Sequence, residues 1–187
     1  MKLLNQYEIN TLNAEGIEYL FNIFKKDFID NKTYLVKGTD SLEIDINEEE
    51  TCPCPHGNEE KPERFWHVIT NTKKTSVKAK NPCLDPKEAE RSYDKARAKR
   101  IHWIKILIDN WQTDSNLSHF YQTRSGQKNL IIWERKENFL IIIRKIRNDN
   151  TRFLVSSYIV YDEEAEYRYK KQLKRYDKNK PTGEEWF

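Results

Sequence analysis

The sequence predicts an α+β protein, with an antiparallel sheet of four or more strands packed against helices in a single domain that begins with a helical, acidic N-terminal segment. Two observations favour this class. Apolar residues recur at helical spacing in the first part of the chain, whereas strand-like segments bounded by short turns fill residues 118–161. A chain of 187 residues can form one good hydrophobic core, but two domains of this chain would be small.

The N-terminal third is expected to form a helix and a hairpin. Residues 13–29 are typical of an amphipathic helix, because apolar side chains recur every three or four positions. These side chains are Ile17, Leu20, Phe21, Phe24 and Phe28. Residues 33–37 and 42–46 are predicted strands with a turn at 38–41, since apolar and acidic residues alternate in the second strand.

The middle of the chain is predicted to hold two loops, a strand and a long helix. Residues 47–63 are the clearest loop, with three prolines and a run of acids. Residues 64–70 are a predicted strand with His67 on one face, and a basic loop covers 71–84. A helix is then expected from Asp85 to about Trp111, because Asp-Pro-Lys-Glu is a typical helix start.

The last part of the chain is predicted to be a strand region followed by a basic helix over 162–177. The expected strands are residues 118–123, 129–134, 139–147 and 151–161. Short turns at Ser125-Gly126 and at 148–150 separate neighbouring strands. Strands joined by such short turns must be antiparallel.

Charge is divided unevenly along the chain. Residues 1–63 hold six Lys and Arg against fourteen Asp and Glu, a net charge of −8, and residues 64–187 carry a net charge of +11. This division suggests a basic surface with an acidic cover, or a polyanionic partner. The alternative is a surface that is simply well solvated.

Several classes of protein are not expected. The chain has no run of 18 apolar residues and starts with polar residues, so neither a membrane partner nor a secretion signal is expected, and the cytoplasm is the expected location. Three cysteines argue against a disulfide framework. Cys52, Cys54 and His56, with Cys83 further on, offer zinc-ligand types. Their spacing is not the usual one for zinc, so no metal is expected. The segment is interpreted as a loop stiffened by proline, with zinc binding as the alternative.

Four residues are candidates for chemistry on phosphate. His67 is either a general base or a satisfied core histidine. Arg97 and Arg100 lie in line with the apolar stripes of the predicted helix, which suggests an anion for them to meet. They could instead pair with the acids at 48–50 or reach water. Ser156 lies in an apolar strand, where its hydroxyl needs either a phosphate or a backbone partner.

Short motifs occur in a defined order. They are FWHVIT at 65–70, RAKRIHW at 97–103, IIW at 131–133 and FLVSSY at 153–158, and a basic segment follows them. Together they resemble the phage-associated nucleases grouped with barnase, EndoU, colicin E5/D and RelE. The resemblance covers about residues 64–177, with two departures. His102 replaces an expected proline, and Ser156-Ser157 replaces Thr-Ala.

The resemblance implies a four-stranded antiparallel sheet packed on helices and toxin-like, metal-independent RNA cleavage without a cofactor. Its implied active residues are His67, Arg97, Arg100 and Ser156. In this hypothesis His67 takes the proton from a ribose 2′-OH, the two arginines stabilise charge on the phosphate, and Ser156 donates to a phosphate oxygen. The acidic segment 1–63 and the tail 178–187 lie outside the match, so their roles stay open.

Nucleic acid is the expected partner, and RNA is favoured over DNA. Basic residues on the helices predicted at 85–111 and 162–177 are the expected binding residues: Lys99, Lys105, Lys170, Lys171, Lys174 and Arg175. The alternative function is a non-catalytic nucleic-acid-binding protein, in which the chain forms a homo-oligomer. Formation of a cleavage product distinguishes the two hypotheses.

Overall fold

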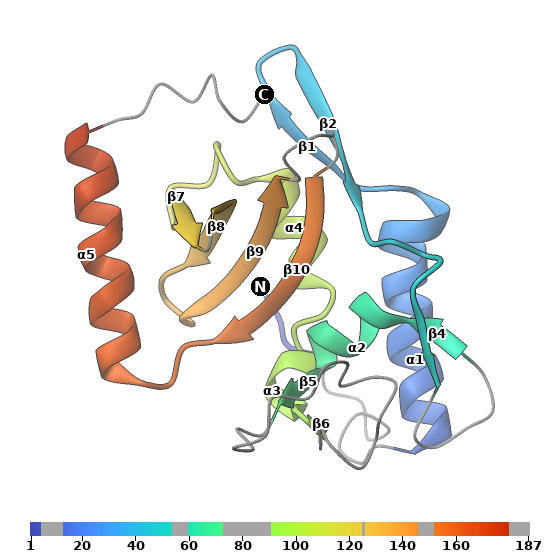
Figure 1. Ribbon diagram of the computed structural model, residues 1–187. Coiled ribbons are helices and arrows are strands. Elements are labelled where there is room, and N and C mark those ends of the chain that lie inside the picture. Colours follow the sequence, from blue (N-terminus) through green and yellow to red (C-terminus); the bar gives the residue numbers. More distant parts are fainter. Residues whose placement is uncertain (5–12, 54–59, 73–90, 125, 146–151, 180–187) are drawn as a thin grey trace.

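The computed structural model describes residues 1–4, 13–53, 60–72, 91–124, 126–145 and 152–179. It confirms the predicted α+β class, because helices pack on a six-stranded curved sheet whose strand order is β1-β2-β10-β9-β8-β7 (Figure 1). Within these described ranges, no helix has the length and apolarity that crossing a membrane requires.

The four C-terminal strands agree with the sequence prediction. They are β7 (Leu117–Arg124), β8 (Gln127–Glu134), β9 (Phe139–Lys145) and β10 (Arg152–Ile159), and each neighbouring pair is antiparallel. The turn from β7 to β8 includes Gly126 with a φ of +74°, a conformation that glycine adopts without strain. The turn expected at 148–150 lies outside the described residues.

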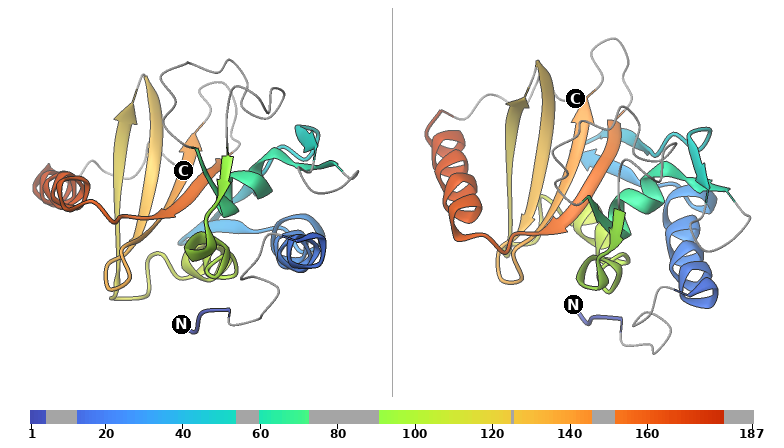
Figure 2. Two further views of the ribbon diagram at one scale, coloured as in Figure 1. Left: turned by 90° about the horizontal axis from the view of Figure 1, so that it is seen from below. Right: turned by 60° about the horizontal axis from the view of Figure 1, so that its bottom comes forward.

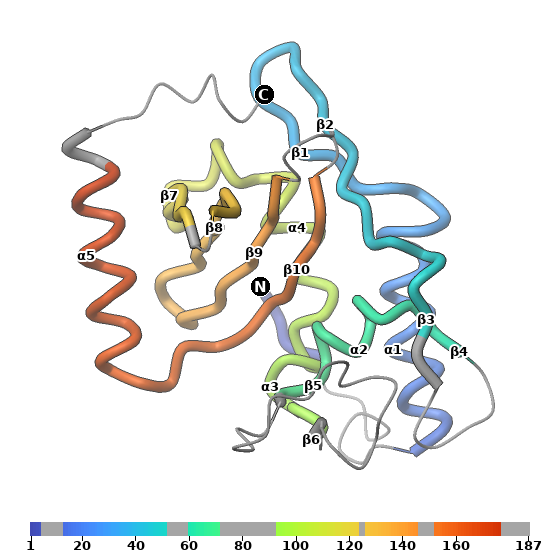
Figure 3. Tube along the Cα trace, viewed as in Figure 1, coloured from blue at the N-terminus to red at the C-terminus, as the bar shows by residue number. Residues whose placement is uncertain are grey.

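The N-terminal hairpin extends this sheet. Strands β1 (Tyr34–Lys37) and β2 (Asp40–Asp45) are antiparallel and are joined at Gly38, whose φ is +60°. Strand β2 then runs parallel to β10, so segments far apart in the sequence lie side by side (Figure 3). The sheet is therefore mixed, and the acidic segment contributes two of its strands.

Both faces of the sheet are covered. Helix α5 (Glu163–Asn179) lies on one face, and helices α1 (Ala14–Lys25) and α4 (Trp103–Asp109) lie on the other (Figure 2). Alternate residues of β8 follow this division: Ile131 and Trp133 pack in the cluster under α5, whereas Leu130 and Ile132 belong to the main core. Cover on both faces explains why residues 130–133 of β8 form a continuous apolar run.

The first predicted helix is confirmed. The side chain of Asn13 accepts a hydrogen bond from the Gly16 amide at 2.8 Å and caps α1. The helix continues into one π turn, η2 (Lys26–Asp30). Four of the five apolar residues predicted from helical spacing are buried in the main core, and Phe21 is half-buried against it; the four are Ile17, Leu20, Phe24 and Phe28.

The predicted strand at 64–70 is wrong for all but its last residue, because Glu63–Ile69 form helix α2. Phe65, Trp66, Val68 and Ile69 are all buried. This i, i+1, i+3, i+4 pattern is that of a helix with one apolar face, and an alternating strand would have exposed half of these residues. Pro62 precedes the helix and Glu63 opens it, both favourable at a helix start.

The predicted single helix from Asp85 to about Trp111 is helical only at 95–98 and 103–109 in its described part. Strand β6 (Arg91–Tyr93) pairs with β5 (Thr70–Thr72), the short helix α3 (Lys95–Ala98) follows, and turns separate it from α4. The side chain of Asp94 accepts hydrogen bonds from the amides of Ala96 and Arg97 at 3.1 Å, so it starts a new helix at this point. Residues 85–90 lie outside the described part of the chain.

The predicted loop 47–63 contains secondary structure. Strands β3 (Thr51–Pro53) and β4 (Glu60–Pro62) form a separate two-stranded sheet. The side chain of Thr51 donates to Glu60 at 2.7 Å across this pair. Three prolines and several acids obscured the pattern, because such residues are uncommon in strands.

Candidate nucleic-acid interface

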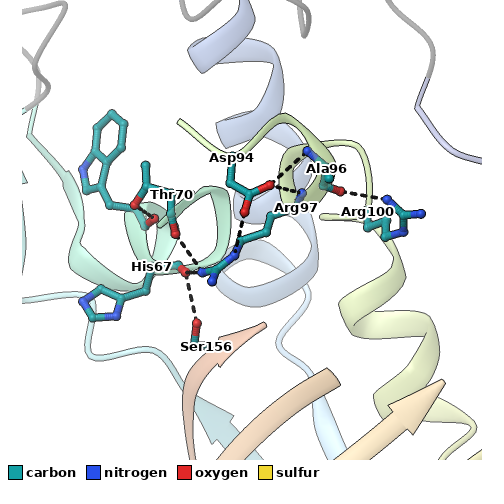
Figure 4. A network of polar contacts seen from close by, with 8 residues as sticks. His67, Thr70, Asp94, Ala96, Arg97, Arg100 and Ser156 are labelled. Carbon is teal, nitrogen blue, oxygen red and sulfur yellow. Dashed lines mark hydrogen bonds and ion pairs between the residues drawn. The ribbon is translucent and has the colours of Figure 1, made fainter. Parts of the chain in front are cut away.

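Three of the four predicted catalytic residues meet where α2, α3 and β10 come together (Figure 4). The main-chain carbonyl oxygen of His67 accepts a hydrogen bond from Arg97 Nη1 at 3.3 Å and another from Ser156 Oγ at 3.1 Å. The arginine and the serine therefore contact the backbone of His67. The sequence predicted either a phosphate or a backbone partner for the hydroxyl of Ser156, and the structure shows a backbone partner.

Arg97 holds the end of helix α2. Its Nη1 also donates to the Thr70 carbonyl oxygen at 2.7 Å, and its Nε lies 3.2 Å from a carboxylate oxygen of Asp94. The last carbonyl groups of a helix have no partner within the helix, and a guanidinium can supply one. Asp94 fixes the guanidinium in place, and the ring of Tyr158 lies 5.5 Å from its central carbon. In this arrangement Arg97 joins α2 to α3.

Arg100 does not join this group. Its guanidinium donates to the Ala96 carbonyl oxygen at 3.1 Å and pairs with Glu137 at 3.0 Å. It also lies over the ring of Trp103 at 4.9 Å. Figure 4 shows the side chain directed away from Arg97 and His67. Both arginines thus have acidic protein partners among the described residues, which are Asp94 for Arg97 and Glu137 for Arg100.

The imidazole of His67 points away from the guanidinium of Arg97 (Figure 4). Its Nε2 lies 2.9 Å from a carboxylate oxygen of Glu63, one helical turn earlier on α2. The side chain is 24% exposed, so a solvent molecule or ligand can reach it. A carboxylate in this position orients an imidazole, as in acid–base pairs generally.

A groove between α5 and the sheet gathers positive charge. It has a volume of about 580 Å³, and Trp133, Tyr167 and Leu173 supply apolar surface. Four of its lining residues are cationic: Arg135, Lys170, Lys171 and Lys174. Three of these are among the six nucleic-acid-binding residues predicted from the sequence.

One acid also lines this groove. Glu166 pairs with Lys170 and accepts a hydrogen bond from Asn138 at 3.0 Å. These hydrogen bonds, that from Lys170 first, hold the pKa of Glu166 below its ordinary value. Glu166 therefore stays ionised and neutralises part of the charge of Lys170. Lys171 and Lys174 form no ion pair with any described residue, so their charge is available to a ligand.

The other predicted binding residues lie elsewhere. Arg175 is exposed on α5 next to Lys174. Lys105 lies on α4 and pairs with Asp109 at 3.1 Å, and Lys99 ends α3, where its carbonyl oxygen accepts from the Leu4 amide. The six residues therefore do not form one surface.

Sequence reasoning missed Arg135 and Tyr167 as groove residues. Arg135 directly follows β8 and donates to the carbonyl oxygens of Ser115 and Asn116 at 2.7 Å and 3.3 Å, which fixes its position beside the groove. A basic pair at 135–136 just after a strand was the available signal. Tyr167 precedes the predicted lysines by one helical turn on α5.

Within the described residues, no group of three or more His, Cys, Asp or Glu side chains could hold a metal ion. Cys54, His56 and Cys83 lie outside the described part of the chain, and the structure describes only the backbone of Cys52. The zinc alternative for this loop therefore stays a hypothesis.

Comparisons with protein-family models, curated proteins and solved structures gave no match to this chain.

Proposed function

We propose that the protein binds nucleic acid through the groove between α5 and β8. The observation that carries this proposal is the combination of four cationic side chains with aromatic surface in one groove. Lysine and arginine attract phosphates by releasing their counterions, and aromatic rings offer faces on which bases stack. Both kinds of contact are available there.

The position of the lysines within α5 supports this function. Basic residues in the last turn of a helix are common because they interact with the helix dipole. Lys170 and Lys171 lie in the middle of the 17-residue helix, where the dipole has little effect. Lys170 pairs with Glu166 one turn earlier, whereas Lys171 has no ion-pair partner among the described residues, and a polyanionic ligand can supply one. The net charge of +11 over residues 64–187 favours the same class of partner.

The test is a binding measurement with a fluorescent RNA at fixed salt. Each phosphate contact to a single strand raises the binding constant about fivefold at about 0.1 M salt relative to 1 M. The double variant Lys171→Gln/Lys174→Gln should therefore bind about 25-fold more weakly. The matched control is Lys26→Gln/Lys95→Gln, which removes the same charge from η2 and α3 and should bind as wild type does. An equal loss of RNA affinity in both double variants would mean that net charge alone drives binding, and it would contradict binding in the groove.

Metal-independent RNA cleavage is the second candidate function. The observation that favours it is the contact of the partly exposed His67 imidazole with Glu63 at 2.9 Å. In this function His67 acts as general base toward a ribose 2′-OH, and Glu63 positions its ring. Arg97, Arg100 and Ser156 would then support the fold and not contact the phosphate.

RNA incubated with the protein in EDTA tests the second function. His67→Ala should lower the cleavage rate by about 10²–10⁴ while RNA affinity stays unchanged. Glu63→Gln should lower the rate less, since it keeps the geometry of the contact but removes the charge. The absence of any cleavage by wild-type protein, together with groove-dependent binding, would leave the binding function alone.

A further inference from the structure

The groove contains an aromatic side chain that the fold does not bury. Tyr167 is 65% exposed on α5, although it lines a groove whose other apolar residues, Trp133 and Leu173, are buried or half-buried. Other tyrosines of this helix pack inward: the rings of Tyr169 and Tyr176 contact the sheet under α5. Tyr167 therefore contributes little to the core, and its ring remains available to a ligand.

We propose that the groove binds single-stranded nucleic acid, with a base stacked on Tyr167 and the neighbouring phosphates on Lys171 and Lys174. This inference rests on the proposed function and specifies its substrate. Every base has an aromatic face, so stacking on a tyrosine fits any single strand. In a duplex the bases are stacked on one another and paired, and the outer surface presents phosphates that the lysines alone would contact.

The dimensions of the site agree with this assignment. A groove of about 580 Å³ is in the range of pockets that enclose one small organic ligand. A base with its sugar is of that class, whereas a duplex is far too wide to enter. Along α5, Tyr167, Lys171 and Lys174 are spaced by four and three residues, so they share one face of the helix. An aromatic face and two cations thus follow one another along a single line.

Trp133 lines this groove, and its indole is almost fully buried. Its Nε1–H has no hydrogen-bond partner among the described residues, and the side chain is 1% exposed. An unpaired buried N–H is unfavourable.

The experiment compares Tyr167→Ala and Tyr167→Phe for binding to an oligouridine RNA of about 12 nucleotides and to an RNA duplex of the same length. Wild type should prefer the single strand. Tyr167→Ala should weaken single-strand binding about 5- to 150-fold, the range for losing one stacked base, and should leave duplex binding unchanged. Tyr167→Phe keeps the ring and should bind as wild type does. Tyr34→Ala removes another exposed tyrosine, on β1, and serves as the control.

Failure of this inference differs from failure of the proposed function. If the variant Lys171→Gln/Lys174→Gln weakens binding to both RNAs but Tyr167→Ala weakens neither, the groove binds nucleic acid without stacking and the single-strand assignment is overturned. If neither the lysine variant nor Tyr167→Ala changes any binding, the proposed function fails as well. Circular dichroism of each variant verifies that it is folded before binding is compared.

Discussion

The guanidinium of Arg97 donates a hydrogen bond of 2.7 Å to the main-chain carbonyl oxygen of Thr70 and so connects α3 to the end of α2. The same guanidinium contacts the carbonyl oxygen of His67. An arginine that the sequence marked for phosphate chemistry is thus occupied by the backbone of the protein itself. In this structure its contacts join two helices of the fold.

Arg97→Ala should therefore destabilise the protein. The substitution leaves carbonyl groups at the end of α2 without a charged donor, which costs about 2–4 kcal/mol in the free energy of unfolding. Arg97→Lys keeps the charge but not the planar fork of donors, so it should recover only part of this stability. Urea denaturation monitored by tryptophan fluorescence measures both values. A stability within about 0.5 kcal/mol of wild type for Arg97→Ala would contradict this role.

Asp94→Ala should act through the same contacts. Asp94 caps α3 and lies 3.2 Å from Arg97 Nε, so its removal should cost about 1–2 kcal/mol for the cap alone. The two losses should not add, because they share one interaction. A double-mutant cycle should give a coupling energy of about 0.5–3 kcal/mol between Asp94 and Arg97. Full additivity would mean that the ion pair contributes nothing to stability.

Stability should also depend on pH through His102. Burial lowers the pKa of this imidazole from its ordinary value of 6.5, and the nearby N-terminal amine acts in the same direction. Its Nε2 donates to the Lys2 carbonyl oxygen at 2.9 Å, and this hydrogen bond opposes part of the shift because it favours the protonated ring. Because the unfolded chain binds a proton more readily than the folded one, stability is full above pH 6.5 and falls as the pH drops below it.

Denaturant midpoints of wild type and His102→Gln at several pH values test this dependence. The wild type should lose stability below pH 6.5, and the variant should lose less over the same window. Parallel curves for the two proteins would show that other groups cause the acid sensitivity.

The sequence predicted the four C-terminal strands well because their information is local. Alternating or continuous apolar runs and short turns defined β7, β8, β9 and β10, and their antiparallel pairing followed from the turns alone. The parallel pairing of β2 with β10 joins segments far apart in the chain, and no local pattern specifies it. The acidic segment, whose role the resemblance left open, therefore adds two strands to the sheet.

Helix α2 illustrates where local patterns are ambiguous. Phe65, Trp66, Val68 and Ile69 fit a short apolar strand and a short helix equally well in the sequence. Packing decided the outcome, because all four are buried against the core when the segment is helical. The prediction placed His67 on a strand, whereas in the structure it lies on a helix and its ring contacts Glu63.

The groove could be predicted only in part. Charge alone identified Lys170, Lys171 and Lys174, since a basic helix is visible in the sequence. The positions of Arg135 and Tyr167 in the groove could be assigned only from the tertiary structure. The groove forms only when α5 packs beside β8. The predicted convergence of Arg97 and Arg100 on one site is not observed, because the single helix that was expected to hold both residues ends after Ala98.

The salt dependence of RNA binding tests the central claim most directly. With four cations in the groove, the logarithm of the binding constant for single-stranded RNA should fall with the logarithm of salt concentration with a slope of about −2.8, and Lys171→Gln/Lys174→Gln should reduce this slope by about 1.4. The control variant Lys26→Gln/Lys95→Gln should retain the wild-type slope. A wild-type affinity that does not change with salt, or a slope that the groove variant leaves unaltered, would contradict binding of nucleic acid in the α5 groove.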